Sequence, residues 1–324
     1  MSRRYTLALI LAVTTGGMTA AAQPAAGPPV GTVQVTLLGT GNPRPSMERF
    51  GQAILIEAGP ERLLIDAGRG AAQRLFALGG REALVGVGAV FFTHLHSDHV
   101  VGLPDLWLTS WIFGRDKALE VAGPPGTADM SRHLEQAYQW DITMRTRDEG
   151  FPREGVRLAA RDVAPGVVFD RNGVRVTAFA VEHGGVTGPA YGYRVDYGGR
   201  SVAVSGDTVL YEPMLEQVQG VDVFVHEVIS PEVEMRRAAV PDPEAVKKIL
   251  AHHTGPDQVG TLFTRAKIRL GVLSHIVPSP TTAEDLLGPI RRTYSGPLAI
   301  GYDLMTIVIG QTVDVFPRRT LSDR

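Results

Sequence analysis

The 324-residue sequence predicts an α/β fold in which two β-sheets lie between outer layers of helices. Apolar, strand-like runs occur in one group near the start of the chain and in a second group after its middle, and helical patterns interrupt both groups. No Pro/Ser-rich linker or charge run divides the interior. A single domain over residues 33–324 is therefore expected.

The first group of elements is marked by apolar periodicity and by turn residues between the periods. The first strand ends before Gly39-Thr40-Gly41, and a hairpin is expected around Gly59-Pro60. The expected elements are strands at Val33–Leu38, Ala53–Glu57, Arg62–Asp66 and Ala89–Phe92, and helices at Arg69–Leu78, Leu103–Phe113 and Met130–Trp140.

The second group repeats this mixture of strands and helices, which favours a second sheet with its own helical cover. Its expected strands are Val174–Val181, Ala190–Asp196, Ser201–Ser205, Val221–His226, Leu270–Ser274, Leu298–Ile300 and Met305–Ile309. Its expected helices are Pro243–Ala251, Pro256–Thr264 and Thr282–Thr293.

Residues 1–22 have the pattern of a secretory signal peptide. Arg3-Arg4 precede an apolar stretch from Leu7 to Val13, and Ala20-Ala21-Ala22 form a small-residue cleavage site. The stretch is short for a membrane span, so an anchor is the weaker alternative. Ser2-Arg3-Arg4 leaves the twin-arginine route open beside the general one. We expect residues 23–32 to be a flexible connector and the mature protein to be periplasmic or secreted, without membrane contact.

The charge balance and the absence of cysteine limit the chemistry. The formal net charge is -2 and no basic stretch is visible, so no nucleic-acid partner is expected. Because the chain has no cysteine, a metal site cannot use thiolate ligands and no disulfide can form.

Four metal-binding side chains occur in the run His94-Leu95-His96-Ser97-Asp98-His99. Imidazole nitrogen and carboxylate oxygen are ligands that zinc accepts. The run follows an apolar strand, so its side chains lie where the chain leaves the sheet. His94 and His96 can face one metal there, while Asp98 and His99 face a second. A histidine-rich polar turn without a metal is the alternative.

Three more candidate ligands follow later strands: His183, Asp207 and His275. Each of them alone is more typical of a core or turn residue. Strand ends that meet at one edge of a packed sheet would, however, bring all three to the histidine-rich run. Together they would complete two metal sites.

The motifs Thr93-His94-Leu95-His96-Ser97-Asp98-His99, Gly206-Asp207-Thr208 and Ser274-His275 resemble those of the metallo-β-lactamase fold superfamily. Glu182-His183, Val225-His226-Glu227 and His253-Thr254 are similar to further motifs of its tRNase Z-like branch. Secreted members of that branch, similar to arylsulfatases and to unusual β-lactamases, share Trp107, Trp111 and the segment Tyr138-Gln139-Trp140-Asp141. The resemblance runs from about Val33 to Ile309 and implies an αββα sandwich with the site along one edge.

The resemblance also implies roles for individual residues. Two zinc ions, with manganese or iron as alternatives, would be held by His94, His96 and His183 at the first site, by Asp98, His99 and His275 at the second, and by Asp207 between them. Asp98 would orient the attacking water. His253 would protonate the leaving group as a general acid, or else have a helix-capping role, and His226 and Glu227 would lie beside the metals.

One departure from true tRNase Z guides the expected function. Bacterial members carry a long arm that grips tRNA between the motif Tyr191-Gly192-Tyr193-Arg194 and the Gly-Asp-Thr motif, where only residues 195–205 lie in this chain. Without that arm, without a basic surface and with an export signal, pre-tRNA is not expected as a substrate. Trp107, Trp111, Phe113 and Tyr191 would either wall an apolar pocket near the metals or pack in the core.

We therefore expect an exported dinuclear zinc hydrolase that cleaves a small phosphodiester or sulfate ester. A β-lactamase or lactonase, which would attack a carbonyl with the same hydroxide, is the alternative enzyme. A zinc-binding protein without turnover is the alternative outside enzymes. The expected partner is a small-molecule ester, with no nucleic acid, and a homodimer is left open. Because one fold hosts many chemistries, the substrate itself is not fixed by these motifs.

Overall fold

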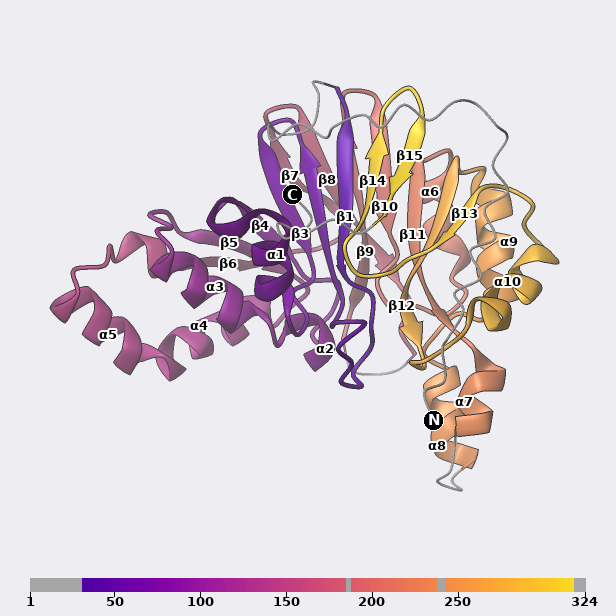
Figure 1. Ribbon diagram of the computed structural model, residues 1–324, viewed down its shortest axis with the longest axis horizontal. Helices are drawn as coiled ribbons and strands as arrows, with labels where there is room; N and C mark the ends of the chain where they lie inside the picture. Colours follow the sequence, from indigo (N-terminus) through magenta and orange to yellow (C-terminus); the bar gives the residue numbers. More distant parts are fainter. Residues whose placement is uncertain (1–30, 185–187, 238–242, 318–324) are drawn as a thin grey trace, which may run out of the picture.

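The computed structural model describes residues 31–184, 188–237 and 243–317. Two β-sheets pack face to face, and helices lie on both outer surfaces (Figure 1). The predicted αββα sandwich is confirmed. The predicted signal peptide and nearly all of the connector lie outside the described residues. The two sheets share one core, which supports the single domain that we propose for residues 33–324.

The first sheet has eight strands. In chain order they are β1 (Val33–Gly39), β2 (Ala53–Ala58), β3 (Glu61–Ile65), β4 (Ala89–Phe91), β5 (Leu119–Gly123), β6 (Leu158–Asp162), β14 (Met305–Ile309) and β15 (Val313–Phe316). Across the sheet the order is β15-β14-β1-β2-β3-β4-β5-β6. The strands from β3 to β6 are parallel, so crossover connections must join them, and these carry helices.

The second sheet has seven strands. They are β7 (Gly166–Arg171), β8 (Val174–Val181), β9 (Ala190–Tyr197), β10 (Arg200–Val204), β11 (Val223–Ile229), β12 (Leu270–Val277) and β13 (Leu298–Ile300). Their order is β13-β12-β11-β10-β9-β8-β7. The strands from β7 to β10 form antiparallel hairpins, whereas those from β10 to β13 are parallel.

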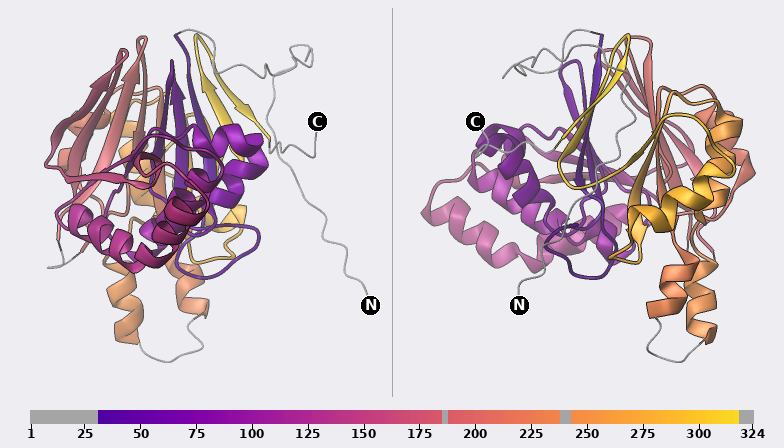
Figure 2. Two further views of the ribbon diagram at one scale, coloured as in Figure 1. Left: turned by 90° about the vertical axis from the view of Figure 1, so that its left-hand side faces the viewer. Right: turned by 45° about the vertical axis from the view of Figure 1, so that its right-hand side comes forward.

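Ten α-helices complete the described part of the chain. They are α1 (Ala71–Val85), α2 (Ser97–Val100), α3 (Leu103–Ile112), α4 (Thr127–Ala137), α5 (Gln139–Asp148), α6 (Leu215–Val218), α7 (Pro231–Arg237), α8 (Pro243–Leu250), α9 (Pro256–Ala266) and α10 (Ala283–Arg291), with short 3-10 turns at Glu154–Val156 and Glu212–Met214. Figure 2 shows α1 and α3 on one outer surface and α9 and α10 on the other. None of the helices in the described ranges is long and apolar enough to cross a membrane.

The core between the sheets is built from the inward-facing residues of both. Val35, Ile56, Val195 and Val225 are fully or almost fully buried there. Burial of a side chain of this size contributes about 1.5–3 kcal/mol. β11 and β12 are buried at every position because helices cover their outer face, which explains why they are continuous apolar runs in the sequence.

The elements that differ from the prediction lie mostly at the margins of the fold. β6, β7 and β15, which were not predicted, are edge strands with exposed residues, so they lack a continuous apolar run. The short strand β5 and the helix α7 were also missed. The single helix predicted over Met130–Trp140 is instead two helices, α4 and α5, which meet at Tyr138 and extend away from the sandwich (Figure 1).

Candidate metal centre

The seven predicted metal ligands lie at one edge of the sandwich, where four strands end. β8, β10 and β12 point the same way, because β8 and β10 are each antiparallel to β9 and β10 to β12 are parallel. β4 joins them from the other sheet, since Tyr191 N donates a hydrogen bond to Thr93 O (2.8 Å). The turn after β4 therefore meets His183, Asp207 and His275 at one place.

The ligand atoms form the two predicted trios. The candidate atoms of His94, His96 and His183 lie within 4.8 Å of one another, and so do those of Asp98, His99 and His275. Asp207 lies between the trios. Its Oδ2 is 3.4 Å from Nε2 of His99 and of His275, and 3.9 Å from Nε2 of His94 and of His183.

The state of these atoms fits metal ions. His94 Nε2, His99 Nε2 and Asp207 Oδ1 are buried and have no hydrogen-bond partner among the described residues. Buried polar atoms are normally paired, so converging unpaired atoms indicate room for a ligand. Burial, together with the neighbouring His99, holds the pKa of His94 well below its ordinary value, which favours the neutral form that a metal requires.

Asp207 is also suited to its central place. Its burial would by itself raise the pKa, but the imidazoles of His275 and His99 outweigh that effect and hold the pKa well below the ordinary value. The carboxylate is therefore ionised and can bind two cations. The His/Asp clusters and this central carboxylate fit a dinuclear metal site.

A second buried carboxylate supports His99. Asp66 Oδ2 lies 2.8 Å from His99 Nδ1, and Asp66 also accepts hydrogen bonds from Thr93 N (2.8 Å) and Thr93 Oγ1. This contact fixes which ring nitrogen carries the proton and leaves His99 Nε2 for the cluster. Asp66 was not predicted as a site residue. It directly follows β3, so the strand-end rule that found His183 would also have found it.

His253 and Glu227 form a pair beside Asp207. Glu227 Oε1 is 3.2 Å from His253 Nδ1 and accepts hydrogen bonds from the backbone of Thr208 (3.2 Å) and Thr254 (3.0 Å). Burial lowers the pKa of His253, but Glu227 more than compensates and raises it to about 9. His253 is therefore protonated near neutral pH. Its ring atoms also lie within ligand distance of His183 and Asp207, so a role as a metal ligand is the competing assignment.

His226 does not join the other site residues. It precedes Glu227 on β11, and because side chains alternate along a strand, it faces the opposite side. There it is fully buried, with ring contacts to Phe224 and Phe263. The geometry argues against the predicted role of His226 beside the reacting groups.

The aromatic residues do not wall a pocket at the metals. Trp107 and Trp111 are fully buried, and their Nε1 atoms donate to Val156 O (2.8 Å) and Pro152 O (2.9 Å). Tyr191 is buried and donates to Val163 O, and Phe113 packs edge-on against the ring of Phe76. Core packing, the alternative role, is the one that the structure gives to the two tryptophans.

Comparison with known proteins places the chain in a family. Residues 61–276 match the β-lactamase superfamily domain. A protein named Ribonuclease Z from Mycobacterium bovis (strain BCG / Pasteur 1173P2) is 34% identical over 292 residues, which cover 89% of this chain and 100% of the relative. Ribonuclease Z of Mycobacterium marinum is 34% identical over 282 residues, covering 86% of this chain and 99% of the relative.

Solved structures of low sequence identity share the fold. The metallo-β-lactamase fold protein YhfI from Bacillus subtilis superimposes with a TM-score of 0.63 at 16% identity, covering 86% of this chain and 100% of that chain. The short form of human tRNase Z gives a TM-score of 0.60 at 22% identity, covering 86% and 99%.

These findings correct two expectations. The function expected, an exported hydrolase of a small phosphodiester or sulfate ester, is wrong, because the relatives that match along most of the chain are named Ribonuclease Z. The expectation of a small-molecule ester and no nucleic acid as partner is wrong for the same reason. Net charge is a weak guide here because it averages over the whole chain and does not describe the charge of any one surface.

The absence of a long tRNA-gripping arm does not separate this chain from proteins named Ribonuclease Z. The match to the Mycobacterium bovis protein covers that relative completely within 292 aligned residues, so the relative has no long arm that this chain lacks. A short β9–β10 connection is thus compatible with the name Ribonuclease Z. The chain belongs to the metallo-β-lactamase superfamily of hydrolases, in its tRNase Z-like branch.

Proposed function

We propose that this protein is a metal-dependent ribonuclease that hydrolyses a phosphodiester bond in RNA of the tRNA class. The observation that carries the proposal is the set of two ligand trios with Asp207 between them. The choice of RNA follows from the 34% identity to proteins named Ribonuclease Z over their whole length. Zinc is the proposed metal, since five imidazoles and two carboxylates suit it best, with manganese or iron as alternatives.

His94, His96 and His183 would hold one metal ion and Asp98, His99 and His275 the other, with Asp207 shared. When bound, two such ions lower the pKa of a water molecule between them and offset the negative charge of the phosphate. Asp98 lies beside this position, with its Oδ2 3.1 Å from His275 Nε2. It can orient the attacking water and accept its proton.

His253 supplies the opposite proton transfer. Glu227 faces Nδ1 of the ring, which leaves the Nε2 proton for the oxygen that leaves phosphorus. The raised pKa keeps His253 in the acid form at the start of the reaction. Asp98 would therefore act as the base toward the attacking water, and the Glu227–His253 pair as the acid toward the leaving oxygen.

The test uses an end-labelled precursor tRNA transcript. Protein stripped by a chelator and reloaded with zinc should cut the transcript at a defined position, and the stripped protein should not. The variant Asp207→Ala, purified in parallel, should be inactive and thereby control for contaminating nucleases. A zinc-loaded protein that leaves the transcript intact would contradict the proposed function.

A further inference from the structure

His275 occupies an unusual position in the backbone. The pairing of β11 with β12 passes from Glu227–Ser274 directly to Val228–Ile276, so His275 is an extra residue, a β-bulge. Its φ is 41°, in the left-handed region, and it is the one predicted ligand with a positive φ. The sheet alone does not fix its direction. Another part of the molecule must hold this ligand in place.

The loop of residues 40–52, which joins β1 to β2, holds the residues on both sides of His275. Ile276 N donates to Thr40 O (3.1 Å), and Asn42 Nδ2 donates to Ile276 O (2.7 Å). On the other side, Ser274 Oγ donates to Gln52 Oε1 (3.0 Å). Asn42, Gln52 and Ser274 are all buried, so water does not compete for these hydrogen bonds.

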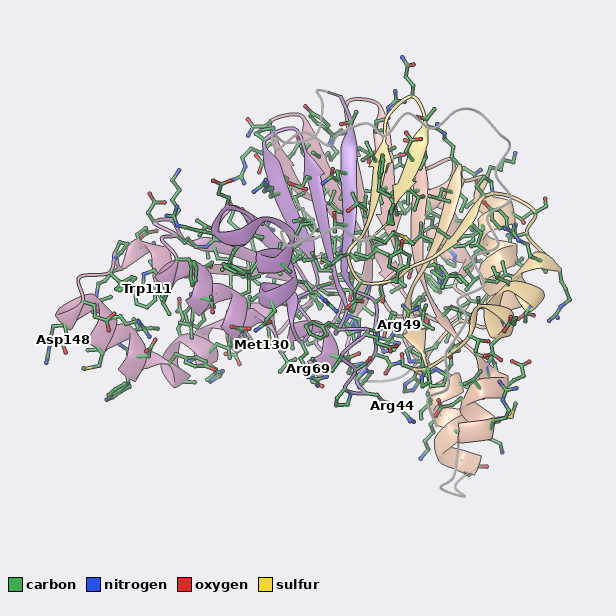
Figure 3. All side chains as sticks on the ribbon, viewed as in Figure 1. Arg44, Arg49, Arg69, Trp111, Met130 and Asp148 are labelled. Carbon is green, nitrogen blue, oxygen red and sulfur yellow. The ribbon has the colours of Figure 1, made fainter. Side chains whose placement is uncertain are left out.

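Asp303 anchors the loop of residues 40–52. This buried carboxylate accepts hydrogen bonds from Thr40 N (3.0 Å), Phe50 N (2.8 Å) and Arg74 Nη2 (2.9 Å). Arg49 adds bonds to Thr40 Oγ1 and Gly301 O, both 2.7 Å. Figure 3 labels Arg49 near β12 and Arg44 on the outer part of the loop. The base of the loop is therefore fixed, and it can act as a rigid support.

We propose that Asn42 is a positioning residue that directs the bulged His275 toward the second metal ion. Its amide makes both contacts that this needs, because Nδ2 binds Ile276 O while Oδ1 accepts from Arg44 N (3.1 Å) and closes the turn of the loop. Gln52 gives a second support through Ser274. The proposal rests on the proposed two-metal site, and it does not depend on RNA as the substrate.

The variant Asn42→Asp tests this, because it keeps Oδ1 and replaces the donor with an oxygen that repels Ile276 O. Zinc titration by calorimetry should show one site with wild-type affinity and the other weakened about 10- to 100-fold. The visible spectrum of the cobalt-loaded protein should change for the second equivalent alone. Gln52→Ala should lower the zinc affinity of the same site. This second variant keeps the test conclusive if Asn42→Asp does not fold.

The matched control is Asn172→Asp, which removes an amide donor to Glu61 (2.7 Å) in the turn between β7 and β8, at the opposite end of β8 from His183. It should leave both sites unchanged. Wild-type affinity at both sites of Asn42→Asp, with an unchanged cobalt spectrum, would overturn the proposal. Equal weakening of both sites, with a lower Tm of the metal-free protein, would also overturn it and assign Asn42 a general structural role. With either of these outcomes, binding of two zinc ions by the wild-type protein would still support the proposed two-metal site.

Discussion

The two halves of the metal centre differ in burial and in support. In the first trio His96 is exposed, whereas the imidazoles of His94 and His183 are nearly buried. In the second trio Asp98, His99 and His275 are all buried. Asp66 fixes the ring of His99, and the loop of residues 40–52 holds the backbone around His275.

The second trio is therefore buried and supported at two of its ligands before a metal arrives, whereas His96 leaves one ligand of the first trio exposed to solvent. Donors that are already held lose less freedom on binding, so the second site should bind its metal more tightly. The exposed His96 also makes the first site the side on which the proposed RNA substrate would approach.

Removal of the shared carboxylate of Asp207 should have the largest effect, because both proposed metal sites lose a ligand. Asp207→Ala should lose both metal ions and more than about 10³-fold in kcat on any substrate. Metal analysis after gel filtration, with kinetics on the same sample, measures both. One retained equivalent of zinc would show that Asp207 serves a single site.

Loss of His253 should separate the chemistry from the metals. His253→Ala should keep both metal ions yet lose roughly 10²-fold in kcat with a poor leaving group. The deficit should shrink for a nitrophenolate leaving group, which needs no proton. Kinetics over a series of leaving groups, with metal content measured, checks this. Loss of one metal would instead identify His253 as a ligand.

A smaller and more local effect is expected at Asp66. Asp66→Asn should weaken the second site alone, by about 10- to 100-fold in affinity, because His99 loses the acceptor that fixes its ring. Competitive titration with a zinc indicator measures the two affinities. Asp170→Asn, which removes an exposed partner of Arg175, is the matched control and should change neither. Weakening confined to the first site would show that Asp66 does not support the second site.

The parts of the molecule that could be predicted from sequence are those with a local signature. The buried strands β11 and β12 are apolar runs, and the turn from His94 to His99 carries its chemistry within a few neighbouring residues. Edge strands such as β6 and β15 have no such signature, since they are short and mix charged with apolar residues at their exposed positions. The fold and the convergence of the ligands were therefore accessible from sequence.

The support of the second site was not accessible in this way. The contacts of Asn42 with Ile276 and of Asp303 with Thr40 join residues more than two hundred positions apart, and amide and carboxylate groups at turns are common in any chain. The predicted role of His226 illustrates a different limit of the sequence. It belongs to a motif of the right composition, but the alternation of β11 directs it away from the cluster. The expectation that no nucleic acid binds rested on net charge, which does not describe local contacts.

The smallest effect is expected at His226. Its neighbour Glu227 on β11 provides a direct comparison, because the two side chains face opposite sides of the same strand. His226→Leu should keep both metals and wild-type kcat, and change the free energy of unfolding by only about 1 kcal/mol, because leucine suits the site beside Phe224 and Phe263. Glu227→Gln should lower kcat at least about 10-fold, since His253 loses the charge that keeps it protonated. Denaturant unfolding and steady-state kinetics on both variants check this. A fall in kcat for His226→Leu with both metals retained would mean that His226 does act on the reacting groups, and that the opposite face of β11 is part of the site.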